Sequence, residues 1–156
     1  MSDTLWQAAG VSGPDEAIMA FLAGEDIVCD RVLLPFDIRA TRAHVRGLRR
    51  IGVVDEEECA VLCNHLDRLA EAVRSGDFSL DERFEDGHSA IEHYLVEHAG
   101  DVGEKVHTGR SRNDQVLVAS RLYLAEALGS LASLVREIGL ACLARAQADA
   151  HTPMPG

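Results

Sequence analysis

The sequence has few aromatic residues and little that predicts β-structure. Phe, Trp and Tyr make up 4% of the 156 residues, and no segment alternates apolar and polar residues between regularly spaced turns, as strands do. Uninterrupted apolar runs are only a few residues long, whereas a bilayer span needs about 18 apolar residues. These absences argue against an all-β fold and against a membrane partner, and we predict an all-α protein.

Basic side chains are also in deficit. The sequence has 15 Lys and Arg against 26 Asp and Glu, which gives a formal net charge of -11 at pH 7. Because nucleic-acid affinity rests largely on phosphate neutralisation by basic side chains, we expect no nucleic-acid partner. Arginines gather within residues 31–50 and acids within residues 55–104. Such blocks are typical of solvated helix faces or subunit contacts.

Evidence for export or for a metal site is also lacking. The first residues, MSDTLWQAAG, have neither the basic flank nor the apolar core of a signal peptide, so the expected location is the cytoplasm. Cys59 and Cys63 are four residues apart with His65 nearby, but this is not a Cys-x-x-Cys spacing and no second ligand pair follows. We therefore expect no metal and no cofactor, and reduced, buried thiols at Cys29, Cys59, Cys63 and Cys142.

Apolar residues recur at helical spacing along most of the chain. We expect helices at about 15–22, 25–50, 55–75, 88–98 and 111–149, with Pro35 as a possible break in the second. Residues 77–87 are expected to form a loop. The apolar positions of the second and third helices are Ile27, Leu34, Ile38, Val45, Leu48, Val61, Leu62, Leu66, Leu69 and Val73.

The last of these helices is unusually long. Residues 111–149 contain no proline and only two glycines. A helix of about 38 residues is about 57 Å long, whereas a compact chain of this length is only roughly 40 Å across. The helix therefore needs neighbours from other chains or from sequence that is absent here. Its apolar seam has the four-three spacing of helix bundles and consists of Leu117, Leu124, Leu128, Leu131, Val135, Ile138 and Cys142.

Polar chemistry concentrates immediately before the long helix, in residues 107–115 (HTGRSRNDQ). Ser111 and Asp114 fit a capping box, and a helix amino terminus offers unpaired N–H groups to an anion. Arg110 and Arg112 can each bind a carboxylate through two hydrogen bonds. The segment is consistent with a site for a small carboxylate-bearing molecule, or alternatively with a charged, well-capped loop.

A second polar cluster, Glu85-Asp86-Gly87-His88, precedes the helix at 88–98. Asp86 and His88 could act as an acid/base pair or orient other groups, and an ordinary helix cap is the alternative. The remaining helical histidines, His44, His93 and His98, are expected to be structural.

Residues 107–115 resemble the first conserved signature of the argininosuccinate lyase family, in the fumarase/aspartase superfamily. Residues 85–88 resemble its Glu-Asp-x-His motif, and Leu5-Trp6 and Asp30-Arg31 resemble further family positions. Met154-Pro155-Gly156 resembles the tripeptide that precedes the family's second signature. The resemblance covers nearly the whole chain, which we expect to be the amino-terminal portion of such a lyase.

The resemblance implies β-elimination of argininosuccinate to arginine and fumarate, in arginine biosynthesis. By motif, Ser111, Arg112 and Asn113 are expected to contact the substrate. Thr108 and Arg110 are expected to shape the loop, and Asp86 and His88 to line or support the pocket. In the family the catalytic acid and base lie in later signatures, so we assign no catalytic residue here and expect the chain alone to be inactive.

The resemblance further implies a small helical domain at residues 1–110 and, at 111–156, the first long helix of a central helical bundle. Family members assemble as homotetramers around such bundles, so we expect self-association through this helix. Asp26 stands where the family often has a substrate-contacting serine, and its role is open. The alternatives are another fumarate-yielding lyase of the superfamily and a non-catalytic helical assembly module.

Overall fold

The computed structural model describes residues 26–81, 84 and 86–153, and within these ranges it contains helices and no β-strand. The predicted all-α fold is confirmed. The chain divides into two compact units, residues 1–120 and 121–156. The helix predicted at 15–22 lies outside the described residues. The elements in order are α2 (Asp26–Arg50), α3 (Glu56–Ser75), α4 (Gly87–Ala99), α5 (Asp101–Glu104), the 3-10 helix η1 (Lys105–His107) and α6 (Arg112–Asp149).

Helix α2 is continuous through Pro35. Proline has no N–H, so the helix lacks one backbone hydrogen bond there. The ring lies on the exposed side, and the apolar face continues on both sides of it. All five residues predicted for this face are buried: Ile27, Leu34, Ile38, Val45 and Leu48.

Helix α3 is defined by caps at both ends. The Asp55 side chain accepts a hydrogen bond from the Glu58 N–H (2.8 Å), and the Glu58 side chain accepts one from the Asp55 N–H (3.1 Å). Gly76 ends the helix at φ 85°, a conformation that favours glycine. Val61 is 41% exposed, because it lies to one side of the buried row formed by Leu62, Leu66 and Leu69.

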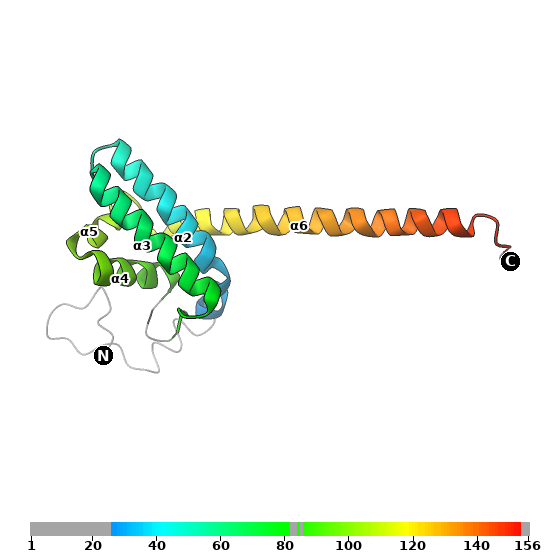
Figure 1. The fold of residues 1–156 in the computed structure, drawn as a ribbon, viewed down its shortest axis with the longest axis horizontal. Coiled ribbons are helices and arrows are strands. Elements are labelled where there is room, and N and C mark those ends of the chain that lie inside the picture. The colour runs from blue at the N-terminus through cyan, green and yellow to red at the C-terminus, as the bar shows by residue number, and fades with distance from the viewer. Residues whose placement is uncertain (1–25, 82–83, 85, 154–156) are drawn as a thin grey trace. The chain divides into compact units, whose positions relative to one another are not determined.

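Helices α2, α3 and α4 pack against one another around the core of the first unit (Figure 1). Helix α4 contributes Ile91 and Leu95, η1 contributes Val106, and the segment between α3 and α4 contributes Leu80. The packing holds the start of α4 and the residues after η1 against α2. These are the two segments in which the predicted site residues occur.

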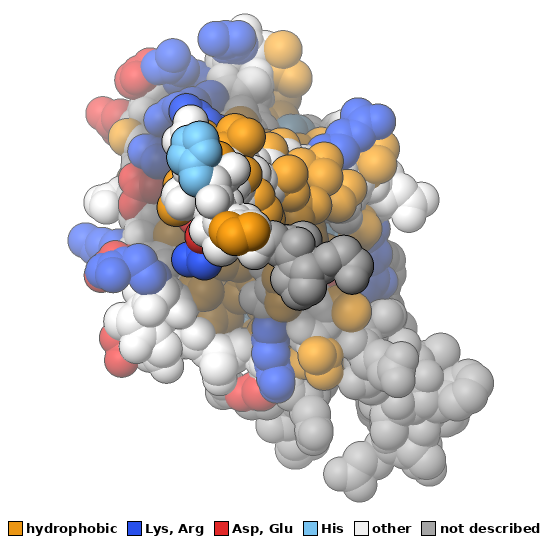
Figure 2. Space-filling view, turned by 90° about the vertical axis from the view of Figure 1, so that its right-hand side faces the viewer, with side chains coloured by type: hydrophobic (Ala, Val, Ile, Leu, Met, Phe, Trp, Pro, Cys, Tyr) orange, Lys and Arg blue, Asp and Glu red, His pale blue; other side chains and the backbone are white. Residues whose placement is uncertain are grey.

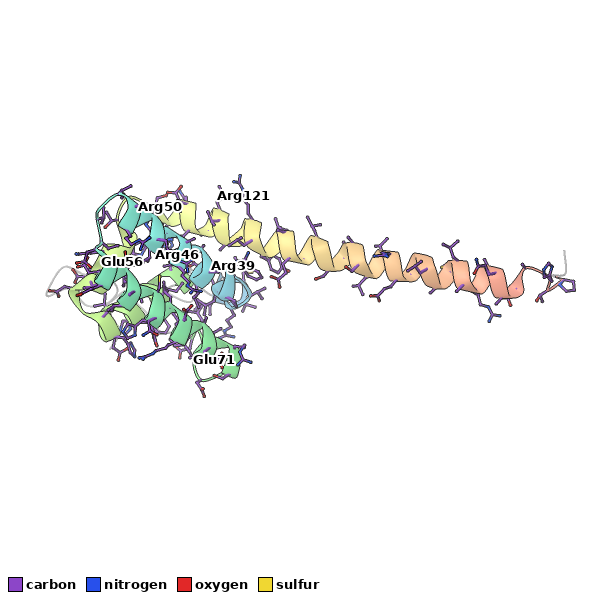
Figure 3. The ribbon with its side chains drawn as sticks, turned by 45° about the horizontal axis from the view of Figure 1, so that its top comes forward. Arg39, Arg46, Arg50, Glu56, Glu71 and Arg121 are labelled. Atoms are coloured by element: carbon purple, nitrogen blue, oxygen red, sulfur yellow. The ribbon has the colours of Figure 1, made fainter. Side chains whose placement is uncertain are left out.

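The arginines of α2 form a solvated face. Arg39, Arg46 and Arg50 are exposed on this helix (Figure 3). Arg49 donates to Glu56 at 2.6 Å, and both side chains are accessible to solvent. Exposed ion pairs of this kind stabilise a fold by only about 0–1 kcal/mol. The arginine face of α2 therefore contributes little to the free energy of unfolding.

Helix α6 confirms the long helix predicted at 111–149. Near its start Gln115 and Ala119 are buried. All members of the predicted apolar seam are exposed, and Leu134, Leu140 and Leu143 add further exposed apolar surface. Figure 2 shows apolar side chains at the surface in orange. An uncovered apolar surface of this extent indicates an interaction site.

Helix α6 also meets, by length and composition alone, the criterion for a membrane span, with an 18-residue window of mean hydropathy 1.5. The window is interrupted by polar residues, so it contains no long uninterrupted apolar run. Core helices of soluble assemblies pass the same test. The finding by itself therefore assigns no membrane.

The expectation of buried thiols is correct only for Cys59. Cys63 is half-buried, whereas Cys29 and Cys142 are exposed. Cys29 lies on the outer side of α2 next to the exposed Val28, and Cys142 lies among the uncovered apolar side chains of α6. All four cysteines are free.

Gly103 allows the close approach of α5 to α4, so Gly103→Ala should destabilise the first unit. A Cβ there would lie 2.5 Å from the Leu95 carbonyl carbon and 2.6 Å from the Val96 nitrogen. Overpacking of this kind costs about 1–3 kcal/mol. Thermal unfolding followed by circular dichroism measures the effect.

The matched control is Gly129→Ala in α6, where no atom lies within 4 Å and alanine should stabilise the helix by about 0.5–1 kcal/mol. Equal effects of the two substitutions would contradict the close packing.

Candidate functional site

The amino terminus of α6 is capped by a pair of its own residues. The Asp114 carboxylate accepts hydrogen bonds from the Ser111 N–H (2.9 Å) and hydroxyl (3.0 Å), while the Asp114 N–H donates to the Ser111 hydroxyl (3.3 Å). The capping box predicted from the sequence is confirmed. Gly109, at φ 73°, provides the left-handed turn that leads into it.

An ion pair joins the two polar clusters that the sequence singled out. The Arg112 guanidinium contacts the Asp86 carboxylate. Asp86 is also the N-cap of α4, where it accepts a hydrogen bond from the Ser89 N–H (2.7 Å). Asp86 is buried and Arg112 is largely exposed. Arg112 therefore has an internal carboxylate partner, with which the carboxylate of a ligand must compete.

Arg110 lies against α2. Its guanidinium donates to the Thr41 hydroxyl at 3.1 Å, and burial lowers its pKa. On the same side, the His44 Nε2–H donates to the Thr108 carbonyl at 3.1 Å. Burial first, and then the Arg110 charge, lower the pKa of His44 and favour its neutral form. Thr108 and Arg110 thus connect the loop to α2 through backbone and side-chain contacts.

Next to this loop is an open hollow of about 340 Å³, lined by Ala40, His44, Gly109, Arg110, Asp114, Gln115 and Val118. Gln115 is buried, and its Oε1 has no hydrogen-bond partner. Buried polar atoms are normally satisfied. Among the described residues, the Gln115 Oε1 is therefore an unsatisfied acceptor at the wall of the hollow.

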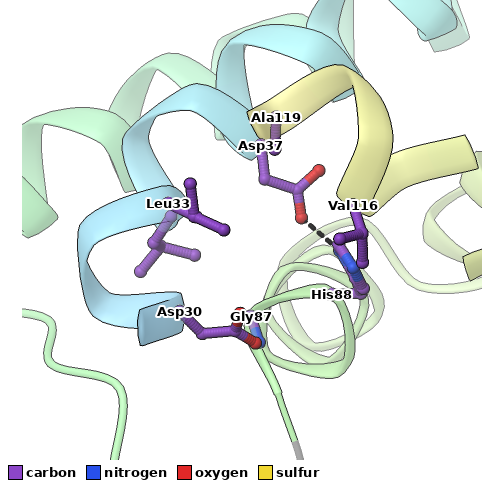
Figure 4. Close-up of a pocket in the computed structure, with 8 residues that line it drawn as sticks. Asp30, Leu33, Asp37, Gly87, His88, Val116 and Ala119 are labelled. Atoms are coloured by element: carbon purple, nitrogen blue, oxygen red, sulfur yellow. Dashed lines mark hydrogen bonds and ion pairs between the residues drawn. The ribbon is translucent and has the colours of Figure 1, made fainter. Parts of the chain in front are cut away.

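His88 lies at the start of α4 and faces α2 (Figure 4). Its Nδ1 contacts the Asp37 carboxylate, while its Nε2 is buried and has no hydrogen-bond partner among the described residues. The neighbouring Gly87 N–H donates to Asp30 at 2.9 Å. Only a small cavity of about 10 Å³ remains here, lined by Asp30, Leu33, Leu34, Asp37, Gly87, His88, Val116 and Ala119.

The predicted site residues fall into two groups. Asp86 and His88 are buried and joined to other elements, whereas Thr108, Ser111, Arg112 and Asn113 are exposed, with Arg110 between these extremes. The side chain of Asp26, the whole of Glu85 and the segment Leu5-Trp6 lie outside the described residues. Among the described residues, no group of three or more His, Cys, Asp or Glu side chains could hold a metal ion.

Sequence reasoning missed Asp37 and Thr41 as parts of this site. Both lie on the core face of α2, in register with Leu34 and Val45. A charged residue on an otherwise apolar helix face was the available signal, because a buried carboxylate requires partners. The identity of those partners depends on which elements pack against α2.

Protonation of Asp114 should weaken the cap of α6. The Ser111 N–H, and then its hydroxyl, hold the pKa of the Asp114 carboxyl below its ordinary value. The stabilisation is therefore present above the unfolded-state value of about 3.9 and is lost as the pH falls through the folded-state pKa. Asp114→Asn should lower the thermal midpoint at neutral pH and have a progressively smaller effect below about pH 4.

Thermal unfolding of both proteins from neutral to acid pH tests this expectation. Asp67→Asn is the control, because Asp67 pairs with Arg42 at 3.0 Å on the surface and does not cap a helix. A difference between wild type and Asp114→Asn that does not change with pH would contradict the proposed cap.

Comparison with known proteins agrees with the motif. A family model described as Lyase matches residues 11–156. The chain is 51% identical over its 156 residues to the argininosuccinate lyases of Stenotrophomonas maltophilia (strain R551-3) and Xanthomonas oryzae pv. oryzae (strain PXO99A). It is 50% identical to that of Xanthomonas campestris pv. campestris (strain B100). These alignments cover 100% of this chain and 36% of each relative, so the chain spans about a third of their length. The predicted resemblance is confirmed, and the chain belongs to the lyase family.

Proposed function

We propose that the chain is the amino-terminal portion of an argininosuccinate lyase, which cleaves argininosuccinate to arginine and fumarate in arginine biosynthesis. The observation that carries the proposal is the 51% identity to proteins of that name along all 156 residues. The lyase family match over residues 11–156 supports the reaction class.

The chemistry of the α6 amino terminus supports this substrate. Argininosuccinate carries several carboxylates, and helix amino termini stabilise negative charge. Ser111, Arg112 and Asn113 are exposed there, and in our proposal they contact the substrate. The pairing of Arg112 with Asp86 holds the guanidinium near the start of α6 before the ligand arrives. Preorganisation of this kind lowers the ordering cost of binding, which offsets part of the competition between Asp86 and the ligand carboxylate for Arg112.

In the proposed reaction a base removes a proton from the carbon next to a carboxylate. The electron pair spreads into that carboxylate as an aci-carboxylate, and the guanidino nitrogen then leaves with a proton from an acid. The chain's contribution is to orient the substrate and to stabilise the developing negative charge near the α6 terminus. We assign neither the acid nor the base to a residue of this chain.

A chimaera tests the proposal. Residues 1–156 replace the aligned portion of the Stenotrophomonas maltophilia argininosuccinate lyase, and fumarate release is followed by its ultraviolet absorbance. We expect turnover, and a loss of about 100-fold or more when Asn113→Ala removes a proposed substrate contact.

The matched control for the chimaera is Asn64→Ala, which replaces an exposed asparagine on α3 and should leave turnover unchanged. A folded, assembled chimaera without activity would contradict the proposal and favour a non-catalytic assembly role. Elimination from a different fumarate-yielding substrate would instead favour another lyase of the superfamily.

We also propose that α6 mediates self-association, as a homotetramer in the full-length protein. Its exposed seam, with Leu124, Leu128, Leu131, Val135 and Ile138 in four-three spacing, supports packing against equivalent helices. The cytoplasm is the proposed location, with the four free thiols as support, since reduced cysteines are typical of that compartment.

The double variant Leu128→Glu/Val135→Glu should therefore weaken self-association. The variant replaces two exposed apolar side chains of the seam with carboxylates. Burying carboxylates between helices is costly. Sedimentation velocity over a range of protein concentrations measures the oligomer. Arg136→Glu is the control, because it changes the charge by the same amount without removing an apolar side chain. Unchanged association of the double variant would exclude the seam as the interface.

A further inference from the structure

A row of buried hydrogen bonds connects the start of α4 to the loop before α6, through the middle of α2. The Asp37 carboxylate contacts His88 Nδ1 through one oxygen and the Thr41 hydroxyl (3.4 Å) through the other. Thr41 in turn accepts from Arg110 at 3.1 Å. The row thus joins both polar clusters of the candidate site through α2. It is a second link between them, in addition to the Arg112–Asp86 ion pair.

Burial makes these contacts obligatory. Asp37 is 2% exposed, Thr41 0% and His88 7%. A carboxylate removed from water is costly unless each of its oxygens is hydrogen-bonded. His88 and Thr41 supply these two contacts.

The direction of each hydrogen bond follows from the chemistry of the groups. An ionised carboxylate only accepts, so Thr41 directs its one hydroxyl proton to Asp37 and can only accept from Arg110. For the same reason His88 must carry a proton on Nδ1. His88 Nε2 is then the only ring nitrogen whose state is open, and it is buried without a partner.

We infer that Asp37 is a positioning residue that holds His88 as the neutral Nδ1–H tautomer, with Nε2 as a free hydrogen-bond acceptor, and that aligns Arg110 through Thr41. A proton on Nε2 would leave a buried donor of a cationic ring unpaired, which costs more than an unpaired acceptor. The groups that face His88 include Asp30 and Asp37 on α2 and the N-cap Asp86.

Nuclear magnetic resonance tests the tautomer in the chain itself. Long-range proton–nitrogen spectra of ¹⁵N-histidine-labelled protein at neutral pH separate Nδ1–H, Nε2–H and doubly protonated rings, and the signal lost in His88→Gln assigns His88. We expect the Nδ1–H pattern in the wild type. An Nε2–H pattern would overturn the role of Asp37, and a doubly protonated ring would overturn the free acceptor.

Asp37→Asn tests the cause of this tautomer. The amide can donate to Nδ1, so the Nδ1–H pattern should be lost or become a mixture with Nε2–H. Glu92→Gln is the matched control, because it breaks a different His–carboxylate contact of this unit, His107 Nε2 to Glu92 at 2.7 Å, and should leave the His88 signal unchanged. An unaltered His88 signal in folded Asp37→Asn, or an equal change in Glu92→Gln, would overturn the inference.

The importance of the row for turnover rests on the proposed function and is measured separately in the chimaera. Asp37→Asn should lower its kcat/KM by about 10- to 100-fold, the range expected when site groups are misplaced. Thr41→Val, which keeps the His88 contact but not the link to Arg110, should cause a smaller loss.

An inactive wild-type chimaera would contradict the proposed function alone, because the tautomer measurement does not depend on activity. Full activity of Asp37→Asn would show that the row does not position the site.

Discussion

A buried carboxylate in the middle of α2 determines how the polar parts of the first unit are arranged. Asp37 can remain inside the core only if hydrogen-bond donors reach it. His88 from α4 supplies one, and Thr41 supplies the other from one turn further along α2. Arg110 reaches the same face of α2, where its guanidinium donates a hydrogen bond to the Thr41 hydroxyl. The apolar packing of α2, α3 and α4 therefore has to bring the start of α4 and the loop before α6 to the same face of α2.

The ion pair between Arg112 and Asp86 has a related effect at the surface. It connects the start of α6 to the start of α4, so the amino termini of two helices are linked by opposite charges. Each terminus is independently capped, by Asp114 with Ser111 and by Asp86 with Ser89. The exposed groups of the candidate site therefore sit on capped helix ends, which are more rigid supports than free loops.

Much of the local structure could be predicted from sequence because its causes are local. Helix boundaries follow from apolar spacing and from caps such as Asp55 and Gly76, whose effects act within a single turn. The continuity of α2 through Pro35 could not be decided in this way. A proline costs one hydrogen bond, and only the burial on both sides of it shows that packing outweighs this loss. The exposure of Val61 could not be decided from the sequence for a similar reason, since the neighbouring helix sets the edge of a buried face.

The sequence by itself determined the helical class, the capped start of α6 and the motif residues that connect this chain to the lyase family. These depend on the order of residues along the chain and on interactions across a few positions. Only the tertiary structure decided that Asp37 meets His88, that Thr41 meets Arg110 and that Arg112 meets Asp86. Those partners are 51, 69 and 26 positions apart in the numbering. Their pairing follows from three helices burying a common core, which no local pattern encodes.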